Sequence, residues 1–369
     1  MRNNAGNDRM SGFAGQDLST SIRPASKASS GGRIASLDGL RAVSISLVFA
    51  SHLYWSKTLP ALDFLWRFQL GDLGVRVFFV ISGFLITHLL LTEEQRHGRI
   101  SLRDFYVRRM LRIFPAYYAF IAFVAAASAL GFLQVRAFDV VTSALYVSNY
   151  VDRPAALAHT WSLSVEEQFY ILWPGILVLL GVRKSIMLAA AFTLFSAGLR
   201  AAYSLPLSSV TNIFWVRFET AGDAIAIGCL FAALRARMWN WEAYRWLCKP
   251  LGTMLAVAAI GFLATSHKWP WFWNALGISL MDLCIVIVLD GCMRAQGFWH
   301  FRLLNCVPVV WLGVLSYSLY LWQQLFLTGL WRIPFPLNLA LTFVAAWLSF
   351  QFIESPVARW RQRRAQTAT

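Results

Sequence analysis

Long apolar stretches alternate with short polar segments from residue 36 almost to the end of the chain. Each stretch has about 18 or more residues with few charges, which is enough for a helix to cross a hydrocarbon core of about 30 Å. Such a segment must satisfy its own backbone hydrogen bonds, so the predicted fold class is all-α, a polytopic transmembrane helical bundle. About ten spans are predicted, at residues 37–55, 72–91, 113–133, 163–182, 185–203, 213–234, 250–266, 274–293, 308–328 and 336–354.

The composition agrees with lipid as the surrounding medium. Of the 369 residues, 58% are hydrophobic and only 14% are charged, whereas about a quarter of the residues in an average soluble domain are charged. The excess of apolar surface therefore has to face something other than water.

The net charge of +15 could indicate a nucleic-acid partner, but its distribution favours another explanation. Of the 33 Lys and Arg residues, 23 fall in the two tails and in the predicted loops on the same side of the membrane, and six fall in the opposite loops. Cytoplasmic loops carry this kind of excess. We therefore expect both termini in the cytoplasm and no nucleic-acid partner.

The polar ends and the cysteines add little chemistry. Residues 1–35 are rich in Ser, Gly and Arg and lack an apolar signal-peptide core, so they are predicted to be a disordered cytoplasmic tail. Residues 357–369 are predicted to be a basic cytoplasmic tail. The five cysteines have no paired spacing, so neither a disulfide framework nor a metal site is expected.

The first predicted span carries a cation and an imidazole on one helical face. Arg41 and His52 are eleven residues apart, which places them within roughly 20° of each other around the helix and about 16 Å apart along it. Asp38 lies on the same helical face as Arg41 and His52 and is interpreted as a structural polar residue. Ionisable residues within a membrane are usually functional. The alternative is that Arg41 only sets topology and that His52 reaches the outer interface.

A basic cluster precedes the third span. Arg108 and Arg112 are four residues apart and share a helical face, with Arg109 beside them. Guanidinium groups bind phosphate in a bidentate manner, so the cluster suits a phosphorylated ligand. A positive flank or a docking patch for anionic lipid headgroups explains it equally well.

Two further sets of charges lie within or near predicted spans. Glu166 and Glu167 lie near the start of the fourth span, where they are either functional or ordinary helix-start residues. Arg76 in the second span is a candidate partner for one of them. Asp223 lies deeper, near Arg217 and Glu219, and is interpreted as an interhelical polar lock.

Five motifs, in order, resemble the acyltransferase 3 family of integral-membrane O-acyltransferases that modify surface polysaccharide, lipopolysaccharide, nodulation factors and some macrolides. They read LDGLRA followed by SH, GVRVFFVISGFLI, RRMLRIFP, HTWSLSVEEQFYILWP and SYSLYLW. The resemblance covers residues 36–356, which are identified as an acyltransferase 3 transmembrane domain. Because the sequence stops soon after the tenth predicted span, the hydrolase-like domain of some relatives is not expected here.

The resemblance also implies roles for individual residues. His52 corresponds to the catalytic base, with Glu166 and Arg41 as its catalytic partners, and Pro115 completes the third motif. The acyl-CoA-binding residues would be Arg41, Arg108, Arg109 and Arg112, and the acceptor-side residues Arg76, His159, Trp161 and Tyr317. Where members of the family often have His, this chain has Gln323, so an acid or base role is not expected there.

The resulting hypothesis is an O-acetyltransferase of the bacterial cytoplasmic (inner) membrane. Acetyl-CoA serves as co-substrate, a carbohydrate or glycolipid hydroxyl as acceptor, and His52 acts as base or as transient acyl carrier. No permanently bound cofactor is expected, whereas membrane lipid and polysaccharide-assembly proteins are expected partners. The alternatives are acylation of a small glycoside such as a macrolide, transport of a glycolipid without acyl transfer, and a scaffold for polysaccharide assembly.

Overall fold

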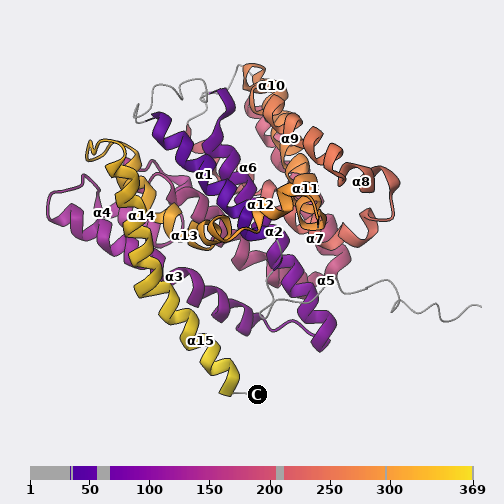
Figure 1. Ribbon diagram of the computed structural model, residues 1–369, viewed down its shortest axis with the longest axis horizontal. Coiled ribbons are helices and arrows are strands. Elements are labelled where there is room, and N and C mark those ends of the chain that lie inside the picture. Colours follow the sequence, from indigo (N-terminus) through magenta and orange to yellow (C-terminus); the bar gives the residue numbers. More distant parts are fainter. Residues whose placement is uncertain (1–33, 35, 56–66, 205–211, 296, 368–369) are drawn as a thin grey trace, which may run out of the picture. The chain divides into compact units, whose positions relative to one another are not determined.

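The structure is a computed structural model that describes residue 34 and residues 36–55, 67–204, 212–295 and 297–367. The predicted disordered tail at residues 1–35 lies outside the described part, except for Ile34. Over the described residues the chain consists of helices joined by turns and short irregular segments, and it contains no strand. The α-helices are α1 (Leu37–Trp55), α2 (Leu70–His97), α3 (Leu102–Ala129), α4 (Ala137–Ala144), α5 (Thr160–Tyr203), α6 (Phe218–Ala221), α7 (Asp223–Met238), α8 (Glu242–Leu247), α9 (Pro250–Ala264), α10 (Pro270–Phe272), α11 (Ile278–Arg294), α12 (Trp299–Leu304), α13 (Val307–Leu327), α14 (Leu337–Ser349) and α15 (Ser355–Thr367) (Figure 1).

Short helical turns of other kinds connect these helices. The 3₁₀ turns are η2 (Ser148–Tyr150), η3 (Ala155–Leu157), η4 (Asn212–Val216) and η5 (Ser266–Lys268), and the π-helical turns are η6 (Trp273–Gly277) and η7 (Phe350–Glu354). The basic segment at 357–369 continues as part of α15 as far as Thr367.

Helices occupy all ten predicted spans, but three of the spans differ from the prediction in continuity. The predicted pair at 163–182 and 185–203 is the single element α5, interrupted at Gly181, where the backbone leaves the helical region with φ 71° and ψ 166°. Glycine tolerates such a positive φ. The predicted span at 213–234 is broken into η4, α6 and α7. At this break the carbonyl oxygen of Thr220 accepts a hydrogen bond from Arg200 Nη1 at 2.6 Å, so a side chain replaces a helical bond.

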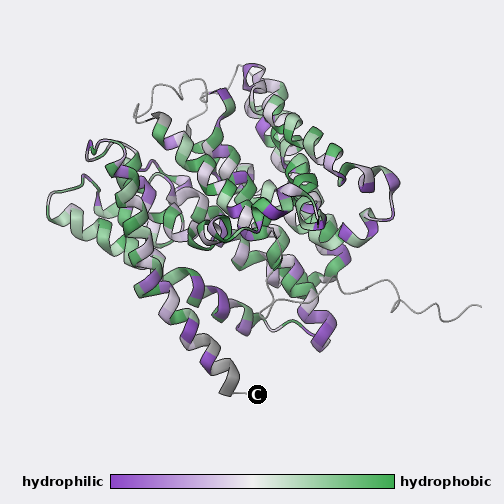
Figure 2. Ribbon diagram, viewed as in Figure 1, coloured by the Kyte–Doolittle hydropathy of each residue, from purple (hydrophilic) through white to green (hydrophobic). Residues whose placement is uncertain are grey.

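Among the described residues, six segments are long and apolar enough to cross a membrane: Leu70–His97, Leu102–Ala129, Ala155–Tyr203, Pro250–Lys268, Pro270–Arg294 and Leu337–Trp360. The count of ten spans and the cytoplasmic location of both termini stay predictions. Apolar residues run along most helices, and polar residues gather at helix ends, most clearly at the end of α2 and along α15 (Figure 2). Large apolar side chains such as Leu179, Leu194 and Val307 are exposed, as expected for a lipid-facing surface.

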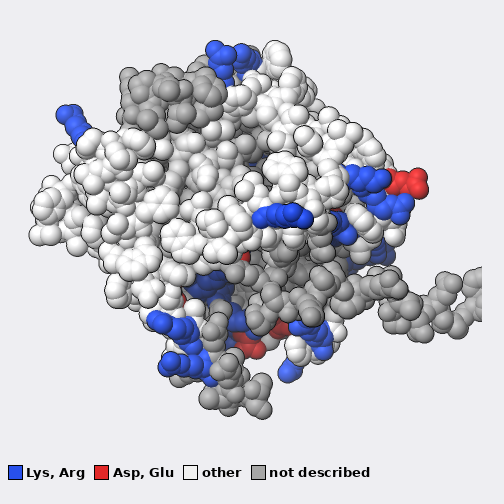
Figure 3. Space-filling view, in the orientation of Figure 1, with Lys and Arg blue, Asp and Glu red and all other residues white. Residues whose placement is uncertain are grey.

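Charged side chains are likewise concentrated in a few regions of the surface. On the face shown, Lys and Arg gather where α15 and the start of α3 lie and again beside α8, while most of the remaining surface carries few charges (Figure 3). The exposed arginines at the start of α3 include Arg103, Arg108 and Arg112.

The helices that carry the candidate residues pack closely at glycines. A Cβ atom added to Gly83 on α2 would overlap the carbonyl group of Ile225 on α7, and one added to Gly228 would overlap the carbonyl oxygen of Val80. The backbones of α2 and α7 are therefore in direct contact, in the manner of small residues at membrane helix interfaces. Helix α2 also packs against α1, and α1 in turn packs against α13.

Candidate functional site

His52 and His159 line one cavity of about 510 Å³. His52 comes from the last turn of α1 and His159 from the residue before α5, while α2 and α13 supply Asp72, Tyr320 and Gln324 to the same lining. Residues more than 100 positions apart in the sequence thus meet around one space. A volume of this size is typical of small-molecule sites.

A hydrogen bond within α1 determines the tautomer of His52. Its Nδ1 atom lies 2.8 Å from the carbonyl oxygen of Val48, one helical turn earlier. A carbonyl oxygen only accepts hydrogen bonds, so Nδ1 carries the hydrogen in the neutral ring. The Nε2 atom then keeps its lone pair, which is the form that a general base or a nucleophile requires.

His159 is buried against aromatic rings. Its ring packs edge-to-face on Phe120 at 5.3 Å and on Tyr320 at 5.5 Å between centroids. Neither of its ring nitrogens has a hydrogen bond of good geometry to any described residue. The Tyr320 hydroxyl is engaged at 2.5 Å with Ser162 Oγ. Buried polar groups without partners are uncommon and frequently mark functional positions.

A second cavity, of about 420 Å³, lies beside the first and shares Gln69, Asp72, Trp161 and His267 with its lining. Trp161 therefore stands between the two spaces, and its ring packs edge-to-face on Phe79 at 6.0 Å. Sequence reasoning assigned no role to Asp72, although its position in the first turn of a predicted span, four residues before Arg76, was a usable signal.

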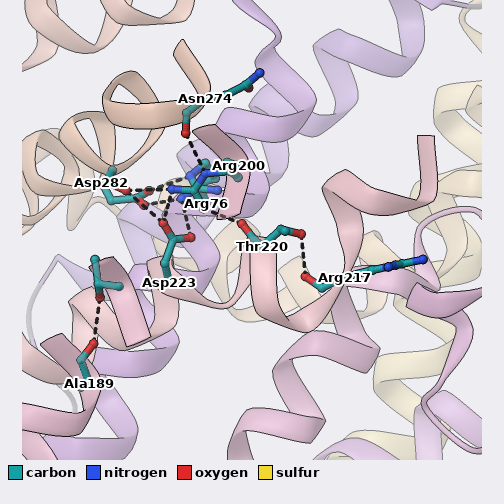
Figure 4. Close-up of polar contacts among 10 residues, drawn as sticks. Arg76, Ala189, Arg200, Arg217, Thr220, Asp223, Asn274 and Asp282 are labelled. Atoms are coloured by element: carbon teal, nitrogen blue, oxygen red, sulfur yellow. Dashed lines mark hydrogen bonds and ion pairs between the residues drawn. The ribbon is translucent and has the colours of Figure 1, made fainter. Parts of the chain in front are cut away.

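Four charged side chains form a buried cluster behind the second cavity (Figure 4). Arg76 donates from Nε to Asp282 Oδ1 at 2.7 Å and from Nη2 both to Asp282 Oδ2 and, at 3.0 Å, to Asp223 Oδ1. Arg200 donates from Nη2 to Asp223 Oδ2 at 2.7 Å. Two cations and two anions balance, and they connect α2, α5, α7 and α11.

The polar partners of Arg200 complete this cluster. Its guanidinium also donates to Ser279 Oγ at 2.9 Å and to the carbonyl oxygens of Asn274 and Thr220. Asp223 is thus held by Arg200 and Arg76, whereas Arg217, considered nearby from the sequence, points away from the cluster (Figure 4) and lies 4.0 Å from Glu219. Neither Arg200 nor Asp282 was identified as a candidate from the sequence.

Glu166 lies in a different environment from His52. Its Oε1 accepts hydrogen bonds from Ser82 Oγ on α2 and from the Tyr170 hydroxyl, and it lies 3.4 Å from Arg109 Nη2. Ser82 is ten residues, or about 15 Å of helix, from Asp72 in the His52 cavity. The candidate pairing of Arg76 with Glu166 is therefore replaced by Arg76 with Asp282 and Asp223, and Glu166 with Arg109.

Arg108, Arg109 and Arg112, the predicted basic cluster on α3, separate into two environments. Arg109 turns toward α5, where its guanidinium covers the Tyr170 ring at 3.5 Å and its Nε lies 3.8 Å from Glu167. Arg108 and Arg112 are exposed, and Arg108 Nη2 donates to Glu93 Oε2 at 2.8 Å. Of these three arginines, Arg108 and Arg112 are accessible to a large ligand.

The remaining predicted residues lie apart from the imidazoles. Arg41 pairs with Asp38 at 3.2 Å near the start of α1, eleven residues from His52. Tyr317 donates its hydroxyl to the carbonyl oxygen of Ile113 on α3 at 3.0 Å, so its hydroxyl faces that helix. Within the described ranges, no group of three His, Cys, Asp or Glu side chains is arranged to hold a metal ion.

Comparison with known proteins gives consistent matches along almost the whole chain. Peptidoglycan O-acetyltransferase OatA of Listeria monocytogenes is 29% identical over 361 residues, covering 88% of this chain and 56% of the relative. A Bacillus subtilis protein named "Putative peptidoglycan O-acetyltransferase YrhL" is 30% identical over 362 residues, covering 88% and 55%. The chain thus spans just over half the length of these relatives. No solved structure gives a significant match.

The family comparison covers the described helices from α1 to α14. Residues 34–353 match the family described as acyltransferase domain (Acyl_transf_3). This range contains both cavities, the buried charge cluster and the arginines of α3. By its sequence over these 320 residues, the chain belongs to the Acyl_transf_3 family of acyltransferase domains.

Proposed function

We propose that this protein is a membrane O-acetyltransferase that moves an acetyl group from acetyl-CoA to a hydroxyl of a cell-wall or other surface carbohydrate. The names of the relatives support the acetyl group and the glycan acceptor. The observation that carries the proposal is the cavity in which a hydrogen bond from Nδ1 to Val48 leaves Nε2 of His52 able to accept a proton.

The direct transfer needs a base for the acceptor hydroxyl and a proton for the departing CoA thiolate, and His52 supplies both. Nε2 of His52 removes the proton of the acceptor hydroxyl as that oxygen attacks the thioester carbonyl carbon. A carbon–oxygen ester bond forms, the carbon–sulfur bond breaks, and the CoA thiolate takes the proton from the imidazolium. His52 thereby returns to its neutral form for the next cycle.

A two-step route uses the same ring as an acyl carrier. Nε2 first attacks the thioester and expels CoA, and the acceptor hydroxyl then attacks the acyl-imidazole while its proton leaves to solvent or to a neighbouring base. His159 is positioned for that second role, since its ring borders the same cavity. Rapid quenching with labelled acetyl-CoA separates the routes, because only the carrier route leaves label on the protein before acceptor is added.

The donor enters, in this proposal, from the cytoplasmic side of the bacterial inner membrane. Arg108 and Arg112 hold the CoA phosphates, because their guanidinium groups are exposed on one face of α3. Arg109 acts as a positioning residue between α3 and α5 through Glu166 and Glu167. Arg41 lies about 16 Å along α1 from His52, a separation that the pantetheine arm has to cover.

The test uses the full chain in lipid nanodiscs with labelled acetyl-CoA and a chito-oligosaccharide. CoA release and labelled saccharide are both expected from the wild type, and both should fall at least about a hundredfold in His52→Ala, the lower range for loss of a general base. His300→Ala removes an imidazole on α12, away from the cavity, and should behave as wild type. A folded His52→Ala protein with full transfer would contradict the proposal.

A further inference from the structure

The second cavity differs from the His52 cavity in its walls. Trp161, Trp215 and Trp273 all contribute to its lining, together with Phe79. These aromatic side chains come from α5, η4, η6 and α2, so four segments distant in sequence supply one aromatic enclosure. Aromatic rings offer flat apolar faces at low conformational cost and suit ligands whose own rings have an apolar face.

Local backbone structure brings Trp273 and its neighbour into this wall. Both Trp273 and Asn274 belong to the π-helical turn η6. The wider turn leaves the Asn274 carbonyl oxygen to accept from Arg200 Nε at 3.1 Å, while the Asn274 amide donates to Ser204 Oγ at 2.7 Å. Single π-turns within α-helices are rare and are frequently found at functional sites.

The charges around the cavity favour a neutral, hydroxyl-rich ligand. Arg76 and Arg200 line it, but their charges are balanced by Asp282 and Asp223 behind the wall. Asp72 remains as an exposed carboxylate that makes no hydrogen bond to a described residue. A carboxylate accepts hydrogen bonds from hydroxyl groups and repels phosphate, so this cavity does not suit the nucleotide part of CoA.

The two cavities are arranged for a ligand that extends between them. Asp72 and Trp161 belong to both linings, so the second cavity lies directly beside the space next to His52. A saccharide has this form, with ring faces that stack on aromatic side chains and hydroxyl groups along its edges.

We propose that the cavity lined by Trp161, Trp215 and Trp273 binds one sugar ring of the acceptor, with Asp72 accepting hydrogen bonds from its hydroxyl groups, so that the adjoining ring presents a hydroxyl to His52. This inference rests on the proposed acetyl transfer and adds to it a glycan subsite of at least two sugar rings. Asp72 and Trp273 then select the acceptor and leave the donor unaffected.

Binding without turnover tests the subsite directly. The His52→Ala protein in nanodiscs is titrated with N,N′-diacetylchitobiose and cellobiose by calorimetry, and separately with CoA. At least one disaccharide should bind, and Trp273→Ala or Asp72→Asn added to this background should weaken that binding about tenfold or more, a loss expected of a stacked ring or a buried hydrogen bond. Affinity for CoA should not change.

Trp271 provides a matched control. It lies two residues from Trp273, is 57% exposed and does not line the cavity, so Trp271→Ala should leave saccharide binding unchanged. Trp273→Phe should recover most of the lost affinity, because it restores an aromatic face, whereas a purely structural defect would also weaken CoA binding.

Turnover separates failure of the subsite from failure of the proposed function. In the His52-containing enzyme, Trp273→Ala should raise the saccharide KM about tenfold, whereas the control Trp271→Ala should leave it unchanged. The inference is overturned if neither disaccharide binds, or if Trp271→Ala and Trp273→Ala weaken binding equally. If saccharide binds as described but His52→Ala retains full transfer, the subsite stands and the proposed role of His52 is wrong.

Discussion

The buried cluster of Arg76, Arg200, Asp223 and Asp282 makes a strong prediction about stability. Asp282→Asn keeps the shape of the side chain but removes one of two negative charges that balance two arginines. Asp282 and Asp223 are fully buried, and the side chains of Arg76 and Arg200 are 12% and 1% exposed. The variant therefore leaves one uncompensated positive charge away from water.

Removing one partner of a buried ion pair costs about 3–5 kcal/mol, because the remaining charge stays desolvated. The Asn amide can still accept one hydrogen bond from Arg76, so we expect the lower part of this range, about 3 kcal/mol. At 1.4 kcal/mol per factor of ten, the folding equilibrium shifts by roughly two orders of magnitude. Arg76→Met combined with Asp282→Asn removes opposite charges together and should be less harmful than the two single changes added.

The assay is reversible unfolding in mixed micelles with increasing SDS, followed by circular dichroism, for both single variants and the double variant. Glu242→Gln on α8 is the control, since Glu242 is 92% exposed and its pairing with Arg245 is solvated, which makes little contribution to stability. An Asp282→Asn protein as stable as wild type would refute the reasoning. So would a double variant whose loss equals the sum of the single losses, because the charges would then act independently.

Three further predictions concern other parts of the chain. Gly83→Leu should lower the melting temperature sharply, because its side chain would meet the Ile225 carbonyl group at the α2–α7 contact, and overpacking typically costs about 1–3 kcal/mol; thermal unfolding followed by size-exclusion chromatography measures it. Burial, and secondarily Asp290, raise the pKa of the Cys248 thiol to about 11, so maleimide labelling should be slow at pH 8 and increase as the pH approaches 11, as measured by mass spectrometry. Charge reversal of Arg108 and Arg112 together should raise the acetyl-CoA KM about tenfold or more and leave the saccharide KM unchanged.

Variants at matched positions serve as controls for these experiments. Gly261 has open space where a Cβ would lie, so Gly261→Leu should be tolerated, and equal damage at both glycines would contradict the packing argument. Fast labelling of Cys248 at pH 8 in the folded protein would contradict its burial. Arg103 is exposed on the same helix but about 140° around from Arg108; if Arg103→Glu had the same effect, general electrostatic attraction would replace the specific donor site.

The sequence predicted the helices better than their interruptions. Apolar runs identify membrane helices because a lipid-facing segment must be apolar along its whole length, and α1 begins and ends at the predicted residues 37 and 55. The break between Arg217 and Asp223 was not predicted, although Glu219, Thr220 and Gly222 interrupt the apolar pattern there. The break is stabilised by Arg200, which lies on another helix, and no local pattern carries that information.

Charged residues were recognised as candidates, but their partners were not. Arg76, Asp223 and Glu166 were identified because ionisable groups in a span are costly. Which of them meet depends on how the helices cross: α2 passes α11 and α7 at Arg76 but faces α5 at Ser82, where Glu166 lies. Asp282 lies in a predicted span and could have been flagged by the same criterion, whereas its pairing with Arg76 needs the tertiary structure.

The buried cluster and the second cavity are two parts of one arrangement. Arg76 and Arg200 line the cavity on one side and bind Asp282 and Asp223 on the other. Since their charges are satisfied behind the wall, they do not attract an anion into the cavity, and they fix α2 and α5 relative to α7 and α11. Asp72 lies one turn from Arg76 on α2, and Asn274, next to Trp273, is held by Arg200. The same ion pairs that stabilise the fold thus fix the segments that carry Asp72 and Trp273 relative to each other, which recognition of a rigid saccharide would require.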